Sequence, residues 1–287
     1  MSASLIVREA HAKVNACLRV LGVRDDGYHD LESLVIPVDL HDTVTVRLAE
    51  GLKVDVHGAS ALVDAVDAGG MNLALVAALA LAETCGGASR GAEVEIAKRI
   101  PVAAGLGGGS ADAAAALHAL NELWGCGLAI EDLISVGERV GSDVPALLGE
   151  GPVVIRGRGA DVEPVHALPT FWAIKTFDFP TRSPDAYRWW DEDGAPTGPE
   201  PGVMYAAFET GQPETMGAGL FNDLEVPVSR RHPEITTAKQ AFLDAGALGA
   251  VMSGSGPTIV ALARTPMHAD RLCEAVSGAF TAVGLEG

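Results

Sequence analysis

The stretch Pro101-Val-Ala-Ala-Gly-Leu-Gly-Gly-Gly-Ser110 is the most informative part of this 287-residue chain. Its closely spaced glycines allow positive φ angles and let the backbone approach a ligand closely. The alanine-rich segment that follows, residues 111–124, is predicted to be a helix. A glycine loop that leads into the start of a helix, with its unpaired N–H groups and the positive end of its dipole, is typical of a phosphate-binding site.

Three other interpretations fit this loop less well. A tight connecting turn needs only one or two glycines. A Walker A loop ends in Gly-Lys-Ser or Gly-Lys-Thr, and this loop does not. A Rossmann fingerprint follows a strand that is apolar along its length, whereas the strand predicted at residues 93–96 alternates charged and apolar side chains. We therefore expect a different nucleotide loop, in which Ser110 either caps the helix or reaches a phosphate or Mg²⁺.

Outward from the loop, strands and helices are mixed and do not follow strict βαβ alternation. Alternating apolar residues predict strands at 4–10, 14–21, 31–38, 43–46, 53–56, 93–96, 153–155, 171–176, 250–252 and 258–263. Those at 31–38, 43–46 and 53–56 are expected to be antiparallel. Helices are predicted at 72–84, 131–139, 233–245 and 268–280, and an exposed loop at 191–202. This mixture indicates two α+β domains, residues 1–155 and 156–287.

Composition excludes several classes of function. A net charge of −18 argues against binding to nucleic acid or to an anionic membrane, because both require clusters of lysine and arginine. The apolar runs are too short to span a bilayer, and no signal peptide is evident, so a cytoplasmic protein is expected. The cysteines Cys17, Cys85, Cys126 and Cys273 show no metal-ligand spacing and are predicted to be reduced.

The loop Pro-x-x-x-Gly-Leu-Gly-Gly-Gly-Ser resembles the phosphate motif of the GHMP kinases. Its three consecutive glycines resemble the branch of that family that serves the non-mevalonate isoprenoid pathway. Further blocks of the family appear in the same order along the chain. They are Ala12–Asn15, Asp26–His29, Asn72-Leu73, Lys98–Pro101, Gly141–Pro145, Asn222–Glu225 and Ser253–Thr258. The chain departs from the family pattern at Ala103-Ala104, where glycine is frequent, and at Ala111, where a second serine is usual.

The resemblance implies an α+β fold of two domains with the active site in the cleft between them. The N-terminal domain would be like the second domain of ribosomal protein S5, and the C-terminal domain would be ferredoxin-like. It also implies ATP-dependent phosphorylation, with Mg²⁺, of the 2-hydroxyl of a methylerythritol that carries a cytidine diphosphate group. No nucleic-acid or membrane partner is expected, and the protein would be a monomer or a weak homodimer. The alternatives are a homoserine- or mevalonate-type kinase and a non-catalytic metabolite sensor.

Two charged residues are candidates for catalysis. Asp143 matches the family's base, which would accept the hydroxyl proton; from the residues alone, a helix N-cap before Pro145 is the simpler interpretation. Lys13 would keep Asp143 ionised and stabilise the developing alkoxide, although a lysine at a strand edge is usually exposed. Asn15 shares the face of Lys13 because strand side chains alternate. This pair of polar side chains on an apolar strand predicts a lined cleft.

The remaining candidates would bind the two substrates. The resemblance places Tyr28 and His29 at the cytosine end of the acceptor, with Tyr187 stacked on its other side; by default, the first two are ordinary turn residues. The pocket hydroxyl is assigned to Ser183, with Thr181 as its competitor, and Lys98 either approaches the nucleotide or faces solvent. The expected ATP-binding residues are Asn72, Lys98, Pro101, Val102, Ala103, Ala104, Gly105, Leu106, Gly107, Gly108, Gly109, Ser110 and Ala111. The expected acceptor-binding residues are Asn15, Tyr28, His29, Ser183, Tyr187, Gly254 and Ser255.

Overall fold

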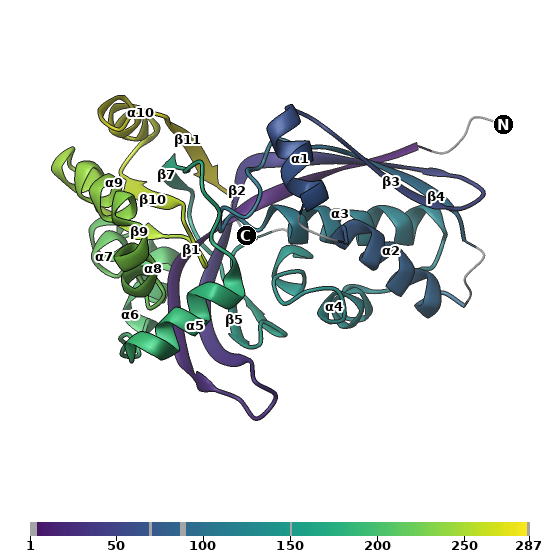
Figure 1. The fold of residues 1–287 in the computed structure, drawn as a ribbon, viewed down its shortest axis with the longest axis horizontal. Coiled ribbons are helices and arrows are strands. Elements are labelled where there is room, and N and C mark those ends of the chain that lie inside the picture. Colours follow the sequence, from purple (N-terminus) through teal and green to yellow (C-terminus); the bar gives the residue numbers. More distant parts are fainter. Residues whose placement is uncertain (1–4, 69–70, 87–89, 150, 286–287) are drawn as a thin grey trace. The chain divides into compact units, whose positions relative to one another are not determined.

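The computed structural model describes residues 5–68, 71–86, 90–149 and 151–285, with helices and strands labelled as in Figure 1. The chain forms two compact units, each discontinuous in sequence. The first unit comprises residues 1–12, 40–102 and 107–149, and the second comprises residues 13–39, 103–106 and 150–287. The division of the sequence at residue 155 stays a prediction.

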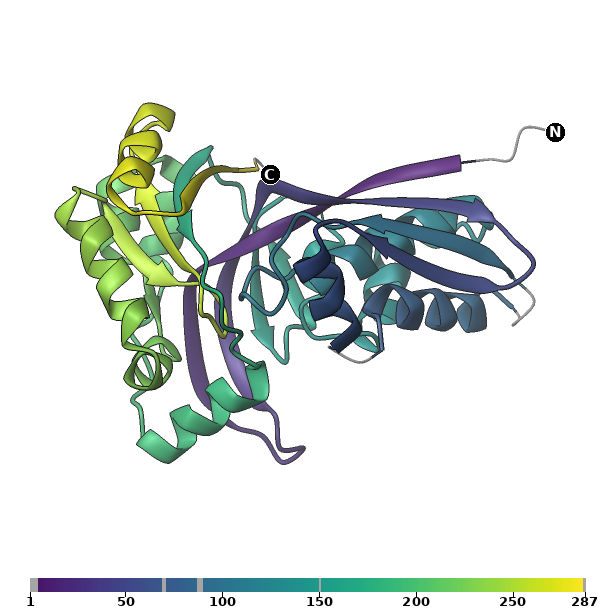
Figure 2. The same ribbon diagram turned by 45° about the horizontal axis from the view of Figure 1, so that its top comes forward.

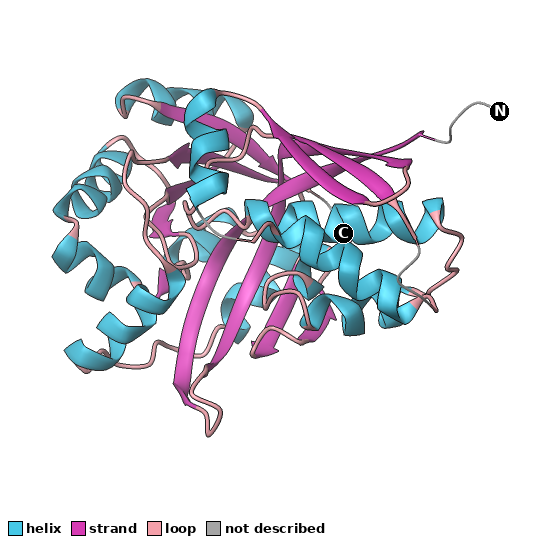
Figure 3. Cartoon of the chain, turned by 45° about the vertical axis from the view of Figure 1, so that its right-hand side comes forward, coloured by secondary structure: helices cyan, strands magenta, loops and turns pink. Residues whose placement is uncertain are grey.

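Two long strands, β1 (Leu5–Val23) and β2 (His29–Leu48), pair with each other and are prominent in Figure 3. Each is continuous where the sequence pattern predicts two shorter strands. The break expected before residue 43 is absent because the polar residue Asp42 is buried inside β2. Its carboxylate accepts hydrogen bonds from Lys98 and from the N–H group of Ile100, so the strand continues through it.

The sheet of the first unit has the order β3–β4–β2. The C-terminal part of β2 is antiparallel to β4 (Ala92–Ala97), and β4 is parallel to β3 (Leu52–His57). Residues 31–38 and 43–46 lie in one continuous strand, so the prediction that they are antiparallel strands is wrong. Residues 43–46 and 53–56 do run antiparallel, as predicted, but they are not hydrogen-bonded neighbours. Alternation identifies a strand without specifying its partner, and β4 comes between these two although it follows them in sequence.

The helices of the first unit are α1 (Ser60–Ala68), α2 (Leu73–Thr84), α3 (Gly108–Leu123) and α4 (Ile130–Glu138), followed by the 3₁₀ helix η1 (Pro145–Leu147). Helices α2 and α3 lie side by side against the sheet (Figure 1). Both bury many alanines, whose small side chains allow the two helices to approach closely. This packing fixes where α3 begins, and the predicted phosphate loop leads into that point.

The cysteine prediction is wrong in part. Cys85 and Cys126 form a disulfide with a Cα–Cα distance of 5.6 Å, whereas Cys17 and Cys273 are free. Cys85 is the C-cap residue of α2, and Cys126 lies two residues beyond Trp124, the C-cap of α3. The close packing of the two helices brings their C-terminal ends together. A spacing of 41 residues gives no local sign of this pairing.

In the second unit, β2 also pairs with β5 (Val153–Gly157), which pairs with β6 (Asp161–Pro164), and β1 is parallel to β8 (Phe221–Asn222). Four further antiparallel strands have the order β11–β7–β10–β9. They are β7 (Thr170–Lys175), β9 (Gly249–Met252), β10 (Ile259–Ala263) and β11 (Ala279–Gly284). Helices α9 (Pro233–Asp244) and α10 (Pro266–Ala275) pack on these strands (Figure 2).

The helix predicted at residues 268–280 ends earlier, because residues 279–284 pair with β7 as β11.

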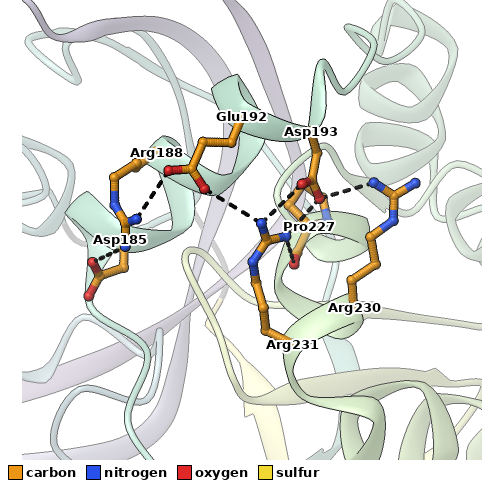
Figure 4. A network of polar contacts seen from close by, with 7 residues as sticks. All are labelled: Asp185, Arg188, Glu192, Asp193, Pro227, Arg230 and Arg231. Atoms are coloured by element: carbon orange, nitrogen blue, oxygen red, sulfur yellow. Dashed lines mark hydrogen bonds and ion pairs between the residues drawn. The ribbon is translucent and has the colours of Figure 1, made fainter.

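The predicted loop at residues 191–202 is also wrong at both ends. Its first residues close α5 (Ser183–Asp193), and its last begins α6 (Gly202–Thr210). The acidic end of α5 is held by ion pairs: Asp193 binds Arg230 and Arg231 of α8 (Glu225–Arg231), as Figure 4 shows. The short helix α7 (Pro213–Ala218) follows α6.

None of the helices in the described part of the chain combines the length and the apolar character that a bilayer span requires.

Candidate active site

Helix α3 begins without a side-chain cap. Its N-cap, Gly107, has φ 71° and makes no side-chain cap hydrogen bond, and the helix starts at Gly108, three residues before the predicted start. Ser110 is therefore inside the first turn and is not the cap. Amides at an uncapped helix start, together with the helix dipole, form an anion-binding site. The structure thus supplies the local geometry expected of a phosphate loop.

The loop before α3 carries backbone strain. Ala103 has φ 52°, in the left-handed region that costs a residue with a Cβ about 1–2 kcal/mol. This is one of the two positions at which the chain has alanine where the family often has glycine. Gly105 has φ 79°, and a Cβ built there would lie 2.1 Å from the carbonyl oxygen of Ser253. Glycine is therefore required at position 105 by a close backbone contact within the second unit.

Lys98 is buried and paired, so the alternative that it faces solvent is wrong. Its ammonium donates to Oδ2 of Asp42 at 2.5 Å and to Oδ2 of Asp112 at 2.8 Å. A Cβ built on Gly108 would lie 3.3 Å from Nζ of Lys98, so the lysine lies directly beneath the first residue of α3. The triad Asp42–Lys98–Asp112 therefore anchors the helix start. Sequence reasoning missed both carboxylates, although Asp112 directly follows the loop.

The triad carries one positive and two negative charges when fully ionised. Burial, opposed by Lys98 and reinforced by the charge of Asp42, raises the pKa of the Asp112 carboxyl to about 7. Although burial lowers the pKa of Lys98, the two carboxylates outweigh it and hold that pKa above its usual value. A proton on Asp112 leaves a neutral set of groups, which costs less to bury than a net charge.

Two other predicted residues of the first unit occupy helix starts or turns. Asn72 is the N-cap of α2, and its Oδ1 accepts a hydrogen bond from the N–H group of Ala74 at 2.8 Å. Asp143 lies in the turn before η1, whose N-cap is Val144 without a side-chain cap hydrogen bond. The simpler interpretation of Asp143 as a helix N-cap is therefore wrong.

In the second unit, Lys13 is 4% exposed, so the interpretation as a surface lysine is wrong. Its ammonium donates to Oδ1 of Asn15 at 2.6 Å, which confirms that the two side chains share a face of β1. The Nδ2 group of Asn15 donates to Oγ of Ser33 at 2.7 Å, and the backbone N–H of Lys13 donates to the carbonyl of Leu106 at 2.9 Å. The lysine is thus fixed both to its own strand and to the glycine loop.

A second glycine loop, residues 253–257, packs against this network. Oγ of Ser253 accepts from the N–H of Asn15 at 3.2 Å and donates to the carbonyl of Gly105 at 2.9 Å. Gly254 has φ 55°, and a Cβ there would lie 2.9 Å from Nζ of Lys13. Glycine at position 254 therefore leaves room for the ammonium group.

Asn222 holds the second glycine loop in place. Its Nδ2 donates to the carbonyls of Met252 and Gly254, both at 2.7 Å, and its side chain is buried. The block Asn222–Glu225 is visible in the sequence, but the pattern gives Asn222 no role. Its function becomes clear only when the strand that carries it is placed beside β1.

The predicted acceptor residues form a second cluster within the same unit. The rings of His29 and Tyr187 stack with centroids 4.8 Å apart and planes 26° apart. Nε2 of His29 lies 3.0 Å from Oδ1 of Asp191. Tyr28 is exposed, and the guanidinium of Arg158 lies 3.7 Å from the centre of its ring. Sequence reasoning missed Asp191 and Arg158, which carry no local motif.

The two hydroxyl candidates differ in environment. Oγ of Ser183 lies 3.0 Å from Oγ of Ser255, so the structure brings these two predicted acceptor residues together. Thr181 is 3% exposed, and its N–H donates to the carbonyl of Ala103. Its hydroxyl has no hydrogen-bond partner in the described part of the chain. Thr181 is therefore enclosed by the protein, whereas Ser183 is exposed.

Family models for "GHMP kinases N terminal domain" and "GHMP kinases C terminal" match residues 72–151 and 204–282. The 4-diphosphocytidyl-2-C-methyl-D-erythritol kinase of Symbiobacterium thermophilum is 42% identical over 271 residues, which cover 93% of this chain and 94% of the relative.

Solved structures of kinases also align with this chain over almost its whole length. A crystal structure of a 4-(cytidine 5'-diphospho)-2C-methyl-D-erythritol kinase aligns with a TM-score of 0.80 and 32% identity, covering 98% of this chain and 100% of the other. The homoserine kinase from Cytophaga hutchinsonii aligns with a TM-score of 0.73 at 23% identity, covering 100% of this chain and 96% of the other. At that identity, the second match shows a shared fold alone.

Proposed function

The chain belongs to the GHMP kinase family, within the 4-diphosphocytidyl-2-C-methyl-D-erythritol kinases, and from this premise we propose how its residues carry out the reaction. The enzyme transfers the terminal phosphoryl group of ATP to the 2-hydroxyl of 4-diphosphocytidyl-2-C-methyl-D-erythritol, giving ADP and the 2-phosphate. The observation that carries the proposal is the uncapped start of α3 after a glycine loop.

The phosphates of ATP bind the amides in the first turn of α3. These amides and the helix dipole favour negative charge, while the buried triad beneath Gly108, neutral when Asp112 is protonated, holds the helix start in place. Mg²⁺ would fit this part of the chain, since it is usually held by phosphate oxygens, water and only one or two protein oxygens, and the hydroxyl of Ser110 in the first turn of α3 would be the residue that holds it. When bound, Mg²⁺ supplies positive charge that offsets the charge on the transferred group.

Asp143 accepts the proton of the 2-hydroxyl as the new P–O bond forms, because an alcohol must lose its proton to become an effective nucleophile. Lys13 stabilises the negative charge that develops on the acceptor oxygen. Its hydrogen bond to Asn15 and its tie to the loop restrict its motion, which keeps the ammonium oriented before the reaction begins. Ser183, which is exposed and whose Oγ lies 3.0 Å from Oγ of Ser255, serves as the pocket hydroxyl, because the Thr181 hydroxyl is enclosed by the protein.

The cytosine of the acceptor binds at the cluster of Tyr28, His29 and Tyr187. A base inserted between two parallel rings needs a ring separation of about 7 Å, twice the usual stacking distance, whereas His29 and Tyr187 are 4.8 Å apart. The base therefore either separates these two rings or stacks on an outer face of the pair. Asp191 orients His29 for a hydrogen bond to the edge of the base.

Replacement of Tyr187 tests this assignment together with the substrate. Wild-type enzyme is expected to release ADP with 4-diphosphocytidyl-2-C-methyl-D-erythritol and not with homoserine or mevalonate, which carry no base. A Tyr187→Ala variant should raise KM for the cytidylated acceptor roughly 5- to 150-fold, since a stacked base contributes about 1–3 kcal/mol. Steady-state ADP release at saturating ATP measures both quantities.

A Tyr187→Phe variant is the matched control, because it keeps the ring and loses only the hydroxyl. It should retain a KM close to that of the wild type. Turnover of homoserine in preference to the cytidylated acceptor would show that the proposed acceptor is wrong. An unchanged KM in Tyr187→Ala would mean that the cytosine binds at another part of the surface, and the proposed reaction would still stand.

A further inference from the structure

Three side chains of the first unit that are common metal ligands meet on one face of two neighbouring strands. Glu9 and His11 belong to β1, and His41 belongs to β2. Nε2 of His11 lies 3.3 Å from one carboxylate oxygen of Glu9, and Nε2 of His41 lies 3.6 Å from the other. One ligand atom from each residue lies within 4.8 Å of the other two. None of these residues has a part in the proposed kinase reaction.

The spacing of these atoms matches a metal coordination shell. A tetrahedral ion with ligand bonds of about 2.0–2.1 Å separates its ligand atoms by about 3.3–3.4 Å, which is close to both Glu9–histidine distances. The two imidazole rings meet edge to face, with centroids 5.3 Å apart and planes 65° apart. Small rotations of the side chains are enough to direct both nitrogens and one carboxylate oxygen to a common point.

The type of donor atom selects the class of ion. Two imidazole nitrogens with one carboxylate suit zinc, copper, nickel or cobalt, whereas magnesium and calcium prefer oxygen ligands alone. Three protein ligands leave a fourth position for water. The side chains of His11 and His41 are 27% and 23% exposed, and that of Glu9 is 58% exposed, so an ion from solvent can reach the site.

The strands hold the ligands before an ion arrives. Residues two apart on a strand face the same way, which places Glu9 beside His11, and the pairing of β1 with β2 brings His41 to them. The neighbour of His41 in sequence is Asp42, whose carboxylate is fixed by Lys98 in the buried triad. The backbone that carries His41 is therefore anchored from the opposite side of the strand.

We propose that Glu9, His11 and His41 form a binding site for a divalent transition metal of the zinc class, chemically distinct from the Mg²⁺ that accompanies ATP. The ion joins β1 to β2 within the first unit.

The test is a calorimetric titration of ZnCl₂ into chelator-treated, tag-free, full-length enzyme in excess Mg²⁺, with a parallel Co²⁺ titration followed by visible absorption. We expect one equivalent of zinc per chain and the absorption bands of cobalt bound to nitrogen and oxygen. Loss of an outer-shell partner typically costs 10- to 100-fold in metal affinity, so His11→Ala and His41→Ala, which remove direct ligands, should weaken binding by at least about tenfold each.

Glu9→Gln keeps the shape of an exposed side chain and should also weaken binding, even where a histidine variant folds poorly. His57→Ala is the control, since His57 is an exposed histidine on β3 of the same unit. The proposal is overturned by the absence of a saturable equivalent in the presence of Mg²⁺, by unchanged affinity in the ligand variants, or by an equal loss in His57→Ala.

Discussion

An Asp143→Asn enzyme is expected to bind ATP nearly as well as the wild type while kcat for the cytidylated acceptor falls roughly 10²–10⁴-fold. That range is typical for the loss of a positioned general base. Asparagine keeps the size of the side chain and its place before η1, but it cannot accept the hydroxyl proton. The loss should therefore appear in kcat and in kcat/KM alike, as expected for an interaction made in the transition state.

The measurement combines steady-state ADP release with an independent titration of a non-hydrolysable ATP analogue. Glu138→Gln is the matched control, because it removes an exposed carboxylate from the end of the neighbouring helix α4 and should leave kcat unchanged. If the Asp143→Asn enzyme bound nucleotide weakly but turned over normally, Asp143 would not be the base and would belong to the nucleotide site.

Local signals in the sequence predict much of this fold. The helices at α2, α3, α4 and α9 and the strands β3, β4, β9 and β10 are confirmed with small shifts at their ends. The pattern fails where long-range pairing decides the outcome. β2 continues through Asp42 because Lys98, 56 residues away, satisfies its charge, and β11 forms because β7 offers it an edge.

The site shows the same division. Motif positions such as Lys13, Asn15 and Gly254 are brought together by the fold, as their spacing and the family resemblance predict. Residues that hold the motif in place, among them Asp42 and Asn222, make contacts to distant segments that alternation and local motifs do not encode. The sequence therefore shows the residues of the motifs more clearly than the residues that hold those motifs in place.

Lys98→Met is expected to lower the free energy of unfolding by about 3–5 kcal/mol, because removing one partner of a buried ionic group leaves uncompensated charge. Here, two carboxylates, Asp42 and Asp112, lose their only cation in the triad. Lys53→Met is the matched control: Lys53 is 63% exposed and pairs with Asp55 at the surface, so its loss should change the free energy of unfolding far less than the loss of Lys98. Urea unfolding followed by circular dichroism measures both variants.

The pH dependence distinguishes lost charge compensation from lost packing. The pKa of Asp112 is raised from 3.8, its ordinary value, to about 7 in the folded protein. The stability that this carboxyl contributes is therefore fully present below the unfolded pKa, and it is lost as pH rises through the folded pKa. Without Lys98, the folded protein should hold the proton of Asp112 still more tightly. The stability that Lys98→Met loses relative to the wild type should therefore grow between pH 5.5 and pH 8.5. Adding Asp112→Asn removes one of the two carboxylates and should recover part of the stability at the higher pH. A deficit that is equal at both pH values, and unchanged in the double variant, would mean that Lys98 stabilises the start of α3 through its aliphatic chain and not through its charge.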